Sequence, residues 1–142
     1  MDMNSRNKIL YAARASRLKK LGYANYDAYL SSEHWLKRRA EFEATHPRKC
    51  RYCGEYGQHL HHRAYRNLGA ETDEDLEWAC AGHHAEITRF GSIQPATERQ
   101  RSILRDHGYA ACFIAIITFG AAFELIGQLG RGEVRSPREL GI

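Results

Sequence analysis

The pattern of apolar and polar positions predicts a mostly helical chain that is interrupted by one short pair of strands. In residues 5–21, apolar side chains recur at helical spacing with basic residues between them, which is typical of a basic amphipathic helix. Its apolar positions are Ile9, Leu10, Ala13, Leu18 and Leu21. Gly22 follows directly and predicts the end of this helix.

A second helix is predicted over residues 33–45, directly after Ser32. Pro47 prevents its continuation, because proline cannot supply the backbone N–H that a helix interior needs. The side chains expected in the core are Trp35, Leu36 and Phe42. Those expected to face water or phosphate are Lys37, Arg38 and Arg39.

Residues 48–57 have the glycines and short spacing of a tight knuckle, and residues 58–62 have the pattern of a short strand. A second strand is expected within residues 63–79, followed by a short helix over residues 82–90 that Gly91 ends. Thr97 and Gln100 form a capping box that predicts another helix over residues 98–107.

Residues 109–123 form a run of fifteen residues without a charge. A membrane-spanning helix needs about 20 apolar residues, and Glu124 and Gln128 interrupt this window. We therefore expect a buried or oligomer-forming helix, with a homodimer through residues 109–129 as the oligomer, and no membrane span. Insertion of residues 109–127 into lipid is the alternative interpretation.

These elements predict an α+β chain, mostly helical, that folds as one compact domain in three segments. The segments are the basic helices of residues 1–47, the knuckle and strands of residues 48–91, and the helices of residues 92–142. A chain of 142 residues can bury one modest core but not two full domains.

The charge distribution favours a nucleic-acid partner for the first half of the chain. Residues 1–66 contain 14 Lys and Arg against 6 Asp and Glu, whereas residues 67–100 contain 2 against 7. The formal net charge is +4. Basic character that precedes and enters the knuckle is typical of phosphate binding.

The first ten residues lack the apolar stretch of a secretory signal, so we expect a cytoplasmic protein. Three of the four cysteines lie near histidines, and in a reducing compartment this grouping indicates a metal site rather than disulfides. Cys50-x2-Cys53 and Cys80-x2-His83 supply two ligand pairs, as a closed tetrahedral zinc site requires. The alternative is that Cys80 and His83 merely begin a helix.

The knuckle region resembles the HNH endonucleases, also called ββα-metal or His-Me finger nucleases. The resemblance covers residues 26–88 and rests on several spaced positions that agree at once. These are Leu60-His61-His62, Tyr65, Leu68-Gly69, Glu71, Asp75-Leu76, Cys80 and His83-His84. It implies a small ββα-metal core with a zinc knuckle. In the predicted fold, two helices precede this core and two C-terminal helices, which lie outside the resemblance, follow it.

The resemblance also implies roles for single residues. His61 and His84 would bind the catalytic ion, Mg²⁺, Mn²⁺ or another divalent cation, and His62 would be the general base. Asp75 would hold the base or its loop. Zn²⁺ at the four knuckle ligands would be structural. His59 is expected to be an exposed residue without a role.

Two positions depart from the family pattern. His83 stands where many members have a fourth cysteine, and Thr88 stands where many have another histidine one turn after His84. DNA contacts are expected from basic residues near the histidines. These are Arg38, Arg39, Arg48, Lys49, Arg51, Arg63 and Arg66.

The expected activity is hydrolysis of DNA phosphodiester bonds to 5′-phosphate and 3′-hydroxyl ends, in a setting such as a phage or a mobile element. A divalent ion and one imidazole can supply the charge compensation and the proton acceptor that this reaction needs. The competing interpretation is a zinc-knuckle DNA-binding module with little catalysis, in which Thr88 marks a decayed site.

Overall fold

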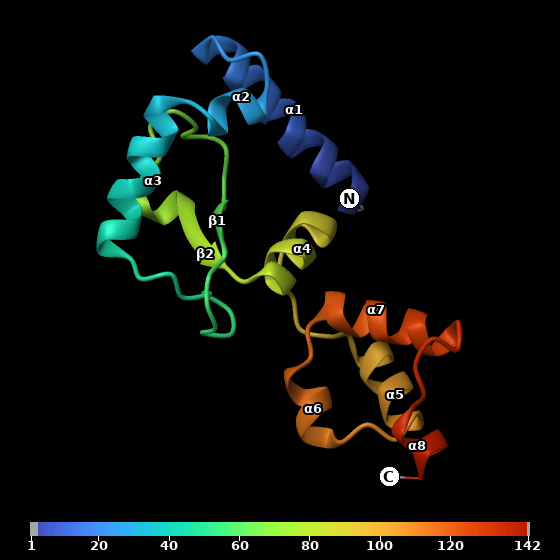
Figure 1. Ribbon diagram of the computed structural model, residues 1–142. Coiled ribbons are helices and arrows are strands. Elements are labelled where there is room, and N and C mark those ends of the chain that lie inside the picture. The colour runs from blue at the N-terminus through green and yellow to red at the C-terminus, as the bar shows by residue number, and fades with distance from the viewer. Residues whose placement is uncertain (1–2, 142) are drawn as a thin grey trace. The chain divides into compact units, whose positions relative to one another are not determined.

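The computed structural model describes residues 3–141 and confirms an α+β chain that is mostly helical (Figure 1). Two strands, β1 (His59–His62) and β2 (Leu76–Ala79), form an antiparallel hairpin. The first helices are α1 (Met3–Leu21), α2 (Tyr26–Leu30), α3 (Glu33–Thr45) and α4 (Ala81–Phe90). They are followed by α5 (Glu98–Asp106), α6 (Ala111–Ile116), α7 (Phe119–Gly130) and α8 (Pro137–Leu140).

Backbone contacts divide the chain into two compact units, Met1–Ala85 and Glu86–Ile142. Unit 1 contains α1 to α3, the hairpin and the first residues of α4, and therefore all the predicted site residues. Unit 2 contains the rest of α4 and the helices α5 to α8. The sequence-based boundaries at residues 47 and 91 differ from this division, which falls within α4.

Side-chain caps fix where the first helices begin. Ser32 accepts a hydrogen bond from the backbone N–H of Trp35 at 3.2 Å, so α3 spans the predicted residues 33–45. Trp35 and Phe42 are buried, as predicted. The expectation for Leu36 is wrong, because its side chain is 54% exposed.

Helix α2 was not predicted from the sequence, since five residues are too short for a helical pattern to be visible. Asn25 caps it by accepting from the backbone N–H of Ala28 at 2.8 Å. The helix buries Tyr29 completely. Helix α1 ends at Leu21, directly before Gly22, as expected, but it exposes Ile9 and Leu10.

The hairpin has a register that gives it two distinct faces. His62 pairs with Leu76 and Leu60 with Trp78, whereas His61 pairs with Glu77. Because successive residues of a strand point to opposite faces, the first two pairs share one face and the third lies on the other.

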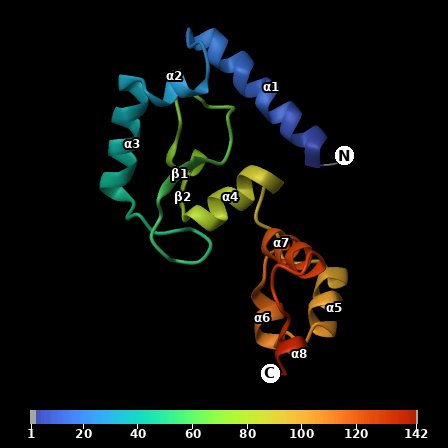
Figure 2. The ribbon, with the colours of Figure 1, turned by 45° about the vertical axis from the view of Figure 1, so that its right-hand side comes forward.

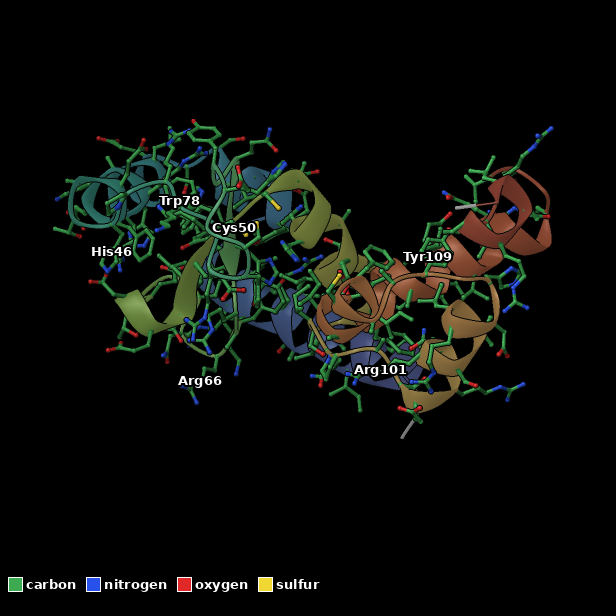
Figure 3. The ribbon with its side chains drawn as sticks, turned by 90° about the horizontal axis from the view of Figure 1, so that it is seen from below. His46, Cys50, Arg66, Trp78, Arg101 and Tyr109 are labelled. Carbon is green, nitrogen blue, oxygen red and sulfur yellow. The ribbon has the colours of Figure 1, made fainter. Side chains whose placement is uncertain are left out.

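The core of unit 1 forms on the face of the hairpin that carries Trp78. Helix α3 runs beside the hairpin in both ribbon views (Figures 1 and 2). It contributes Trp35 and Phe42 to a cluster with Leu76 and Trp78. The indole N–H of Trp78 donates to the backbone carbonyl of His46 at 3.0 Å, and Figure 3 labels both residues.

Unit 2 corrects the predicted C-terminal helices. The apolar run of residues 109–123 is broken at Ile117 and Thr118, so four helices, α5 to α8, stand where two were expected. Thr118 caps α7 by accepting from the backbone N–H of Ala121 at 3.2 Å. Glu86 adds a second cap, accepting from the N–H of Gly120 at 2.9 Å.

The apolar residues of unit 2 form their own small core. Its buried members are Ala96, Leu104, Ile114, Ile117 and Ala122. The predicted helix over residues 98–107 is confirmed as α5, with the predicted capping box between Thr97 and Gln100. Within residues 3–141, no helix combines the length and the apolar character that crossing a membrane requires.

Gly57 tests the packing of the knuckle on the hairpin. A Cβ at this buried position would lie 2.7 Å from the Cβ of Trp78, so we expect Gly57→Ala to destabilise unit 1 by about 1–3 kcal/mol. Urea unfolding followed by tryptophan emission measures this loss. Gly82→Ala is the control, because a Cβ there meets no atom within 4 Å. Equal stability of the two variants would contradict the packing.

Candidate functional site

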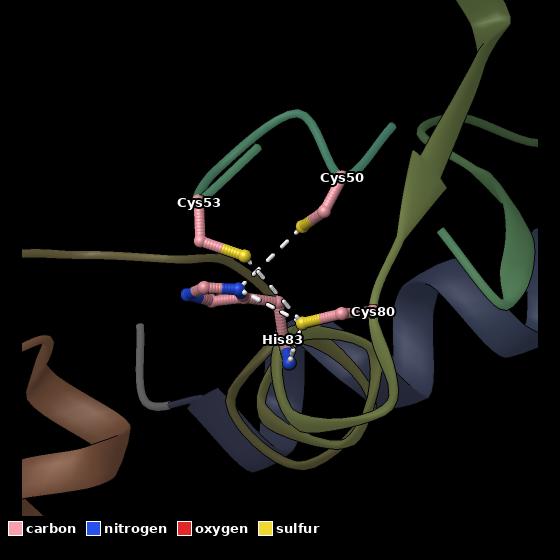
Figure 4. A group of neighbouring side chains, drawn as sticks. All are labelled: Cys50, Cys53, Cys80 and His83. Carbon is pink, nitrogen blue, oxygen red and sulfur yellow. Dashed lines mark hydrogen bonds between the residues drawn. The ribbon is translucent and has the colours of Figure 1, made fainter. Parts of the chain in front are cut away.

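Four side chains of unit 1 converge in a geometry suited to one metal ion (Figure 4). Cys50 and Cys53 come from the knuckle loop, Cys80 directly precedes α4, and His83 lies in the first turn of α4. Their ligand atoms all lie within 4.8 Å of one another. Among the described residues, this is the one group of three or more such side chains that lie so close.

The distances within this Cys/His cluster fit zinc. Zn–S bonds of about 2.3 Å in a tetrahedral site place two sulfurs roughly 3.8 Å apart. The sulfurs of Cys53 and Cys80 are 3.8 Å apart. The Nδ1 atom of His83 lies 3.3 Å from the sulfur of Cys80 and 3.6 Å from that of Cys50. The cluster can therefore hold a metal ion such as zinc, as the ligand spacing predicted.

The knuckle backbone favours the thiolate form of Cys50. The N–H of Cys50 donates to the carbonyl of Glu55 at 2.7 Å, and the N–H of Gly54 donates to the carbonyl of Cys50 at 2.9 Å. Burial alone would raise the pKa of the Cys50 thiol, but backbone N–H groups around its sulfur lower this pKa to about 6. Thiolate is the form that binds metal.

Three imidazoles gather on the face of the hairpin opposite the core. The rings of His61 and His84 are 5.7 Å apart, edge to face at 76°. The rings of His59 and His84 are stacked 4.3 Å apart at 13°. The structure thus brings the two predicted ligands of the catalytic ion together and adds His59, which sequence reasoning left without a role.

Burial favours the neutral form of two of these imidazoles. The pKa of His61 falls to about 4, because burial and then the neighbouring His84 and His62 disfavour the charged ring. The pKa of His84 is also lowered, by burial and by His59. A neutral imidazole is the form that binds a cation or accepts a proton.

His62, the predicted general base, lies on the other face and is 3% exposed. Its ring stacks on Trp35 with the ring centres 4.4 Å apart. Its Nδ1 is 2.7 Å from the hydroxyl of Tyr26, and its Nε2 is 3.2 Å from a carboxylate oxygen of Glu71. Both ring nitrogens are engaged inside the core, and His62 does not join the other imidazoles.

Glu71 is the buried carboxylate that organises this part of the core. Its Oε1 accepts hydrogen bonds from the hydroxyl of Tyr29 and from the N–H of Gly69, and it faces His62. Its buried Oε2 has no hydrogen-bond partner among the described residues and lies 4.0 Å from the Nε2 of His34. Burial would raise the pKa of Glu71, but the hydrogen bonds from His62 and Tyr29 lower it to about 2.

Asp75 is also buried, and it holds a loop rather than the ring of His62. One of its oxygens, Oδ2, accepts from the side chain of Asn67 at 2.9 Å and from the backbone N–H of Thr72 at 2.9 Å. Its backbone carbonyl accepts from the N–H of Arg63 at 2.8 Å. Of the two functions expected for Asp75, the structure favours support of the loop.

The predicted DNA-binding residues fall into distinct environments. Arg38 is 15% exposed and pairs with Asp73, and Arg48 pairs with both carboxylate oxygens of Glu43. Arg66 is 79% exposed and lies at the periphery in Figure 3. Arg51 and Arg63 share one buried carboxylate, that of Glu77.

The remaining predicted positions add less to the site. Lys49 is exposed in the knuckle loop, and the guanidinium of Arg39 lies 6.0 Å over the ring of Trp78. Thr88 lies on the exposed side of α4. Sequence reasoning missed His59 and Glu71 as site residues. Strand alternation around His61 could have found the first, and the second was among the positions of the resemblance but was given no role.

No family model, curated protein or solved structure matches this chain in the three comparisons that we made.

Removal of zinc should unfold unit 1. Zinc binding to small Cys/His domains supplies roughly 10 kcal/mol or more of folding free energy, and Cys53→Ser removes one ligand. We expect this variant to lose zinc, measured by native mass spectrometry. Both tryptophans lie in unit 1, so their emission should shift to the red while the far-UV helical signal of unit 2 remains.

Cys112→Ser is the matched control for this variant, because Cys112 is an exposed cysteine of unit 2, outside the cluster. It should keep zinc and the native emission. A Cys53→Ser protein with a full complement of zinc would contradict the assignment of the ligands.

The buried contact between His62 and Glu71 should contribute strongly to the stability of unit 1. Removal of the imidazole leaves the buried Glu71 carboxylate without one of its hydrogen-bond partners, which costs about 1–3 kcal/mol or more, and it also removes the ring that stacks on Trp35. His62→Ala should therefore lower the urea midpoint strongly, and His61→Ala only slightly. Equal, small losses in both variants would show that His62 is not part of the core.

Proposed function

We propose that this chain is a metal-dependent DNA endonuclease of the HNH type. The observation that carries the proposal is the convergence of His59, His61 and His84 on one face of the hairpin, next to a Cys/His cluster that can hold zinc. Phosphodiester hydrolysis needs charge compensation, which a divalent cation bound by imidazoles would supply, and a proton acceptor, which another imidazole can be.

The zinc cluster has a structural role in this proposal. His83 would bind zinc, so its neighbour His84 is fixed at the first turn of α4. The backbone N–H of His84 donates to the carbonyl of Cys80 at 2.9 Å, which ties the same turn to the end of β2. Zinc binding and the position of the catalytic imidazole are thereby coupled.

The ring orientations suggest how the imidazoles divide the chemistry. Nitrogen lone pairs lie in the ring plane, so the perpendicular rings of His61 and His84 can aim at one divalent cation, whereas the parallel rings of His59 and His84 cannot. We assign His61 and His84 to cation binding and His59 to proton acceptance from water. The cation would polarise the phosphate and stabilise the departing 3′ oxygen.

This assignment moves the general base away from His62. Proton acceptance requires a ring nitrogen that water can reach, and both nitrogens of His62 are engaged with Tyr26 and Glu71 in the core. His62 and Asp75 then act as positioning residues. His62 fixes the hairpin against Trp35, and Asp75 fixes the loop that joins the two strands.

A zinc-dependent DNA-binding module with little catalysis is the second candidate. One observation favours it: among the described residues, only the Cys/His cluster brings three or more possible ligand atoms within 4.8 Å. Thr88 supplies no imidazole where the family often has one. Plasmid retardation without cleavage, in Mg²⁺ or Mn²⁺, would support this candidate over the nuclease.

Plasmid cleavage tests the proposed catalytic residues. We expect the wild-type protein to cut in the presence of Mg²⁺ or Mn²⁺ and to leave 5′-phosphate and 3′-hydroxyl ends. His61→Ala and His84→Ala should abolish cutting, and His59→Ala should slow it by about 10²–10⁴-fold, the usual contribution of a general base. End labelling and single-turnover rates measure both effects.

His107→Ala is the control, because His107 caps α5 in unit 2 and lies outside the proposed site. It should cut at the wild-type rate. Wild-type cleavage by His61→Ala would refute the proposed site, whereas wild-type cleavage by His59→Ala alone would refute only the assignment of the base.

A further inference from the structure

Glu77 is a buried carboxylate that the proposed chemistry does not use. Glu77 is 4% exposed, and its Oε1 accepts a hydrogen bond from the hydroxyl of Tyr52 at 2.6 Å. Its Oε2 is buried without a hydrogen-bond partner among the described residues. Two cations approach this oxygen, the Nε of Arg51 at 3.6 Å and the Nε of Arg63 at 3.5 Å.

The two arginines differ from Glu77 in their exposure. The side chain of Arg51 is 53% exposed and that of Arg63 is 41% exposed, whereas the carboxylate between them is almost completely covered. A guanidinium has five N–H donors, so an arginine whose Nε lies near Glu77 can still present other donors to a phosphate. Two positive charges on one negative charge leave this cluster with a net charge of about +1.

Backbone pairing places this cluster beside the imidazoles. Glu77 lies directly opposite His61 in the hairpin, and directly opposite residues of antiparallel strands share one face. Arg51 belongs to the knuckle and is tied to β2, since its backbone N–H donates to the carbonyl of Trp78 at 3.0 Å. Arg63 directly follows β1, and its Nη1 donates to the carbonyl of Glu74 at 3.1 Å.

Other arginines among the predicted DNA contacts are satisfied inside the protein. The Nε and Nη2 of Arg48 donate hydrogen bonds to Glu43, and its Nη1 donates one to the hydroxyl of Tyr56. Arg38 gives its Nε to a backbone carbonyl and its Nη2 to Asp73, and little of it is exposed. Arg51 and Arg63 combine exposure, a fixed position and proximity to His61.

We infer that Arg51 and Arg63 form a phosphate clamp, held by Glu77, that binds the DNA backbone next to His61. This inference rests on the proposed function and deepens it by naming the phosphate contacts. Guanidinium groups bind phosphate oxygens through paired N–H donors. Glu77 is a positioning residue, because it reaches the phosphate only through the two arginines.

The experiment measures binding of the full-length zinc protein to a fluorescein-labelled DNA duplex by anisotropy, over a series of salt concentrations without added divalent cation. Each phosphate contact contributes roughly one unit to the slope of log affinity against log salt. Arg51→Gln and Arg63→Gln should each lower the slope by about one unit. Arg51→Lys and Arg63→Lys keep the charge and should restore it.

Arg105→Gln is the matched control, since Arg105 is an exposed arginine that also pairs with a carboxylate, that of Glu98 in unit 2. It should keep the wild-type slope and affinity. The clamp is refuted if the two Gln variants also keep them, or if the Lys variants bind as weakly as the Gln variants.

Glu77→Gln tests the positioning role, because both guanidiniums remain while their shared anion is lost. The salt slope should stay at the wild-type value, and single-turnover cleavage at saturating DNA should slow at least tenfold. Wild-type cleavage by this variant would exclude a positioning role for Glu77.

The binding assay separates this inference from the nuclease proposal. Wild-type protein that binds but does not cut, together with reduced slopes in the Gln variants, would refute the nuclease and leave the clamp intact. Wild-type protein that cuts, together with unchanged slopes in the Gln variants, would refute the clamp alone.

Discussion

The side-chain alternation of one short hairpin determines on which face each histidine of β1 lies. Successive residues of β1 point to opposite faces, so His59 and His61 lie on one face and His62 on the other. A shift of one residue in the register would exchange these faces. It would bring His62 to the site and push a neighbouring imidazole against Trp35. The correct register is therefore required for the imidazoles to lie together, whether or not a cation is bound.

A two-stranded sheet is marginal on its own, so other contacts must hold the register. On the core face, the stacking of His62 on Trp35 and its pairing with Glu71 fix the strand against α3. On the other side of the chain, a metal at the Cys/His cluster would join the knuckle loop to the first turn of α4. The hairpin is thus held by the buried contact between His62 and Glu71, and a metal at the Cys/His cluster would hold it further.

The elements that short sequence patterns determine were predicted correctly. The helix of residues 33–45, the Thr97–Gln100 capping box and the Cys/His ligand spacing were all visible in the sequence. Helix α2 was missed because its stability comes from burial of Tyr29 rather than from a pattern. The break in the apolar run was missed because Glu86, distant in sequence, caps α7. His62 was assigned by resemblance, although alternation along β1 separates it from His61.

The acidic segment of the sequence supplies the counter-charges for the basic first half. Residues 71–77 contain three buried carboxylates, those of Glu71, Asp75 and Glu77. Glu71 faces His62, Asp75 holds the loop before β2, and Glu77 lies between two arginines. Since a buried carboxylate without partners would cost several kcal/mol (~3 or more), the basic groups near it are drawn to fixed positions. The buried carboxylates therefore hold basic side chains, such as Arg51 and Arg63, in fixed positions near the imidazoles, and do more than balance the net charge.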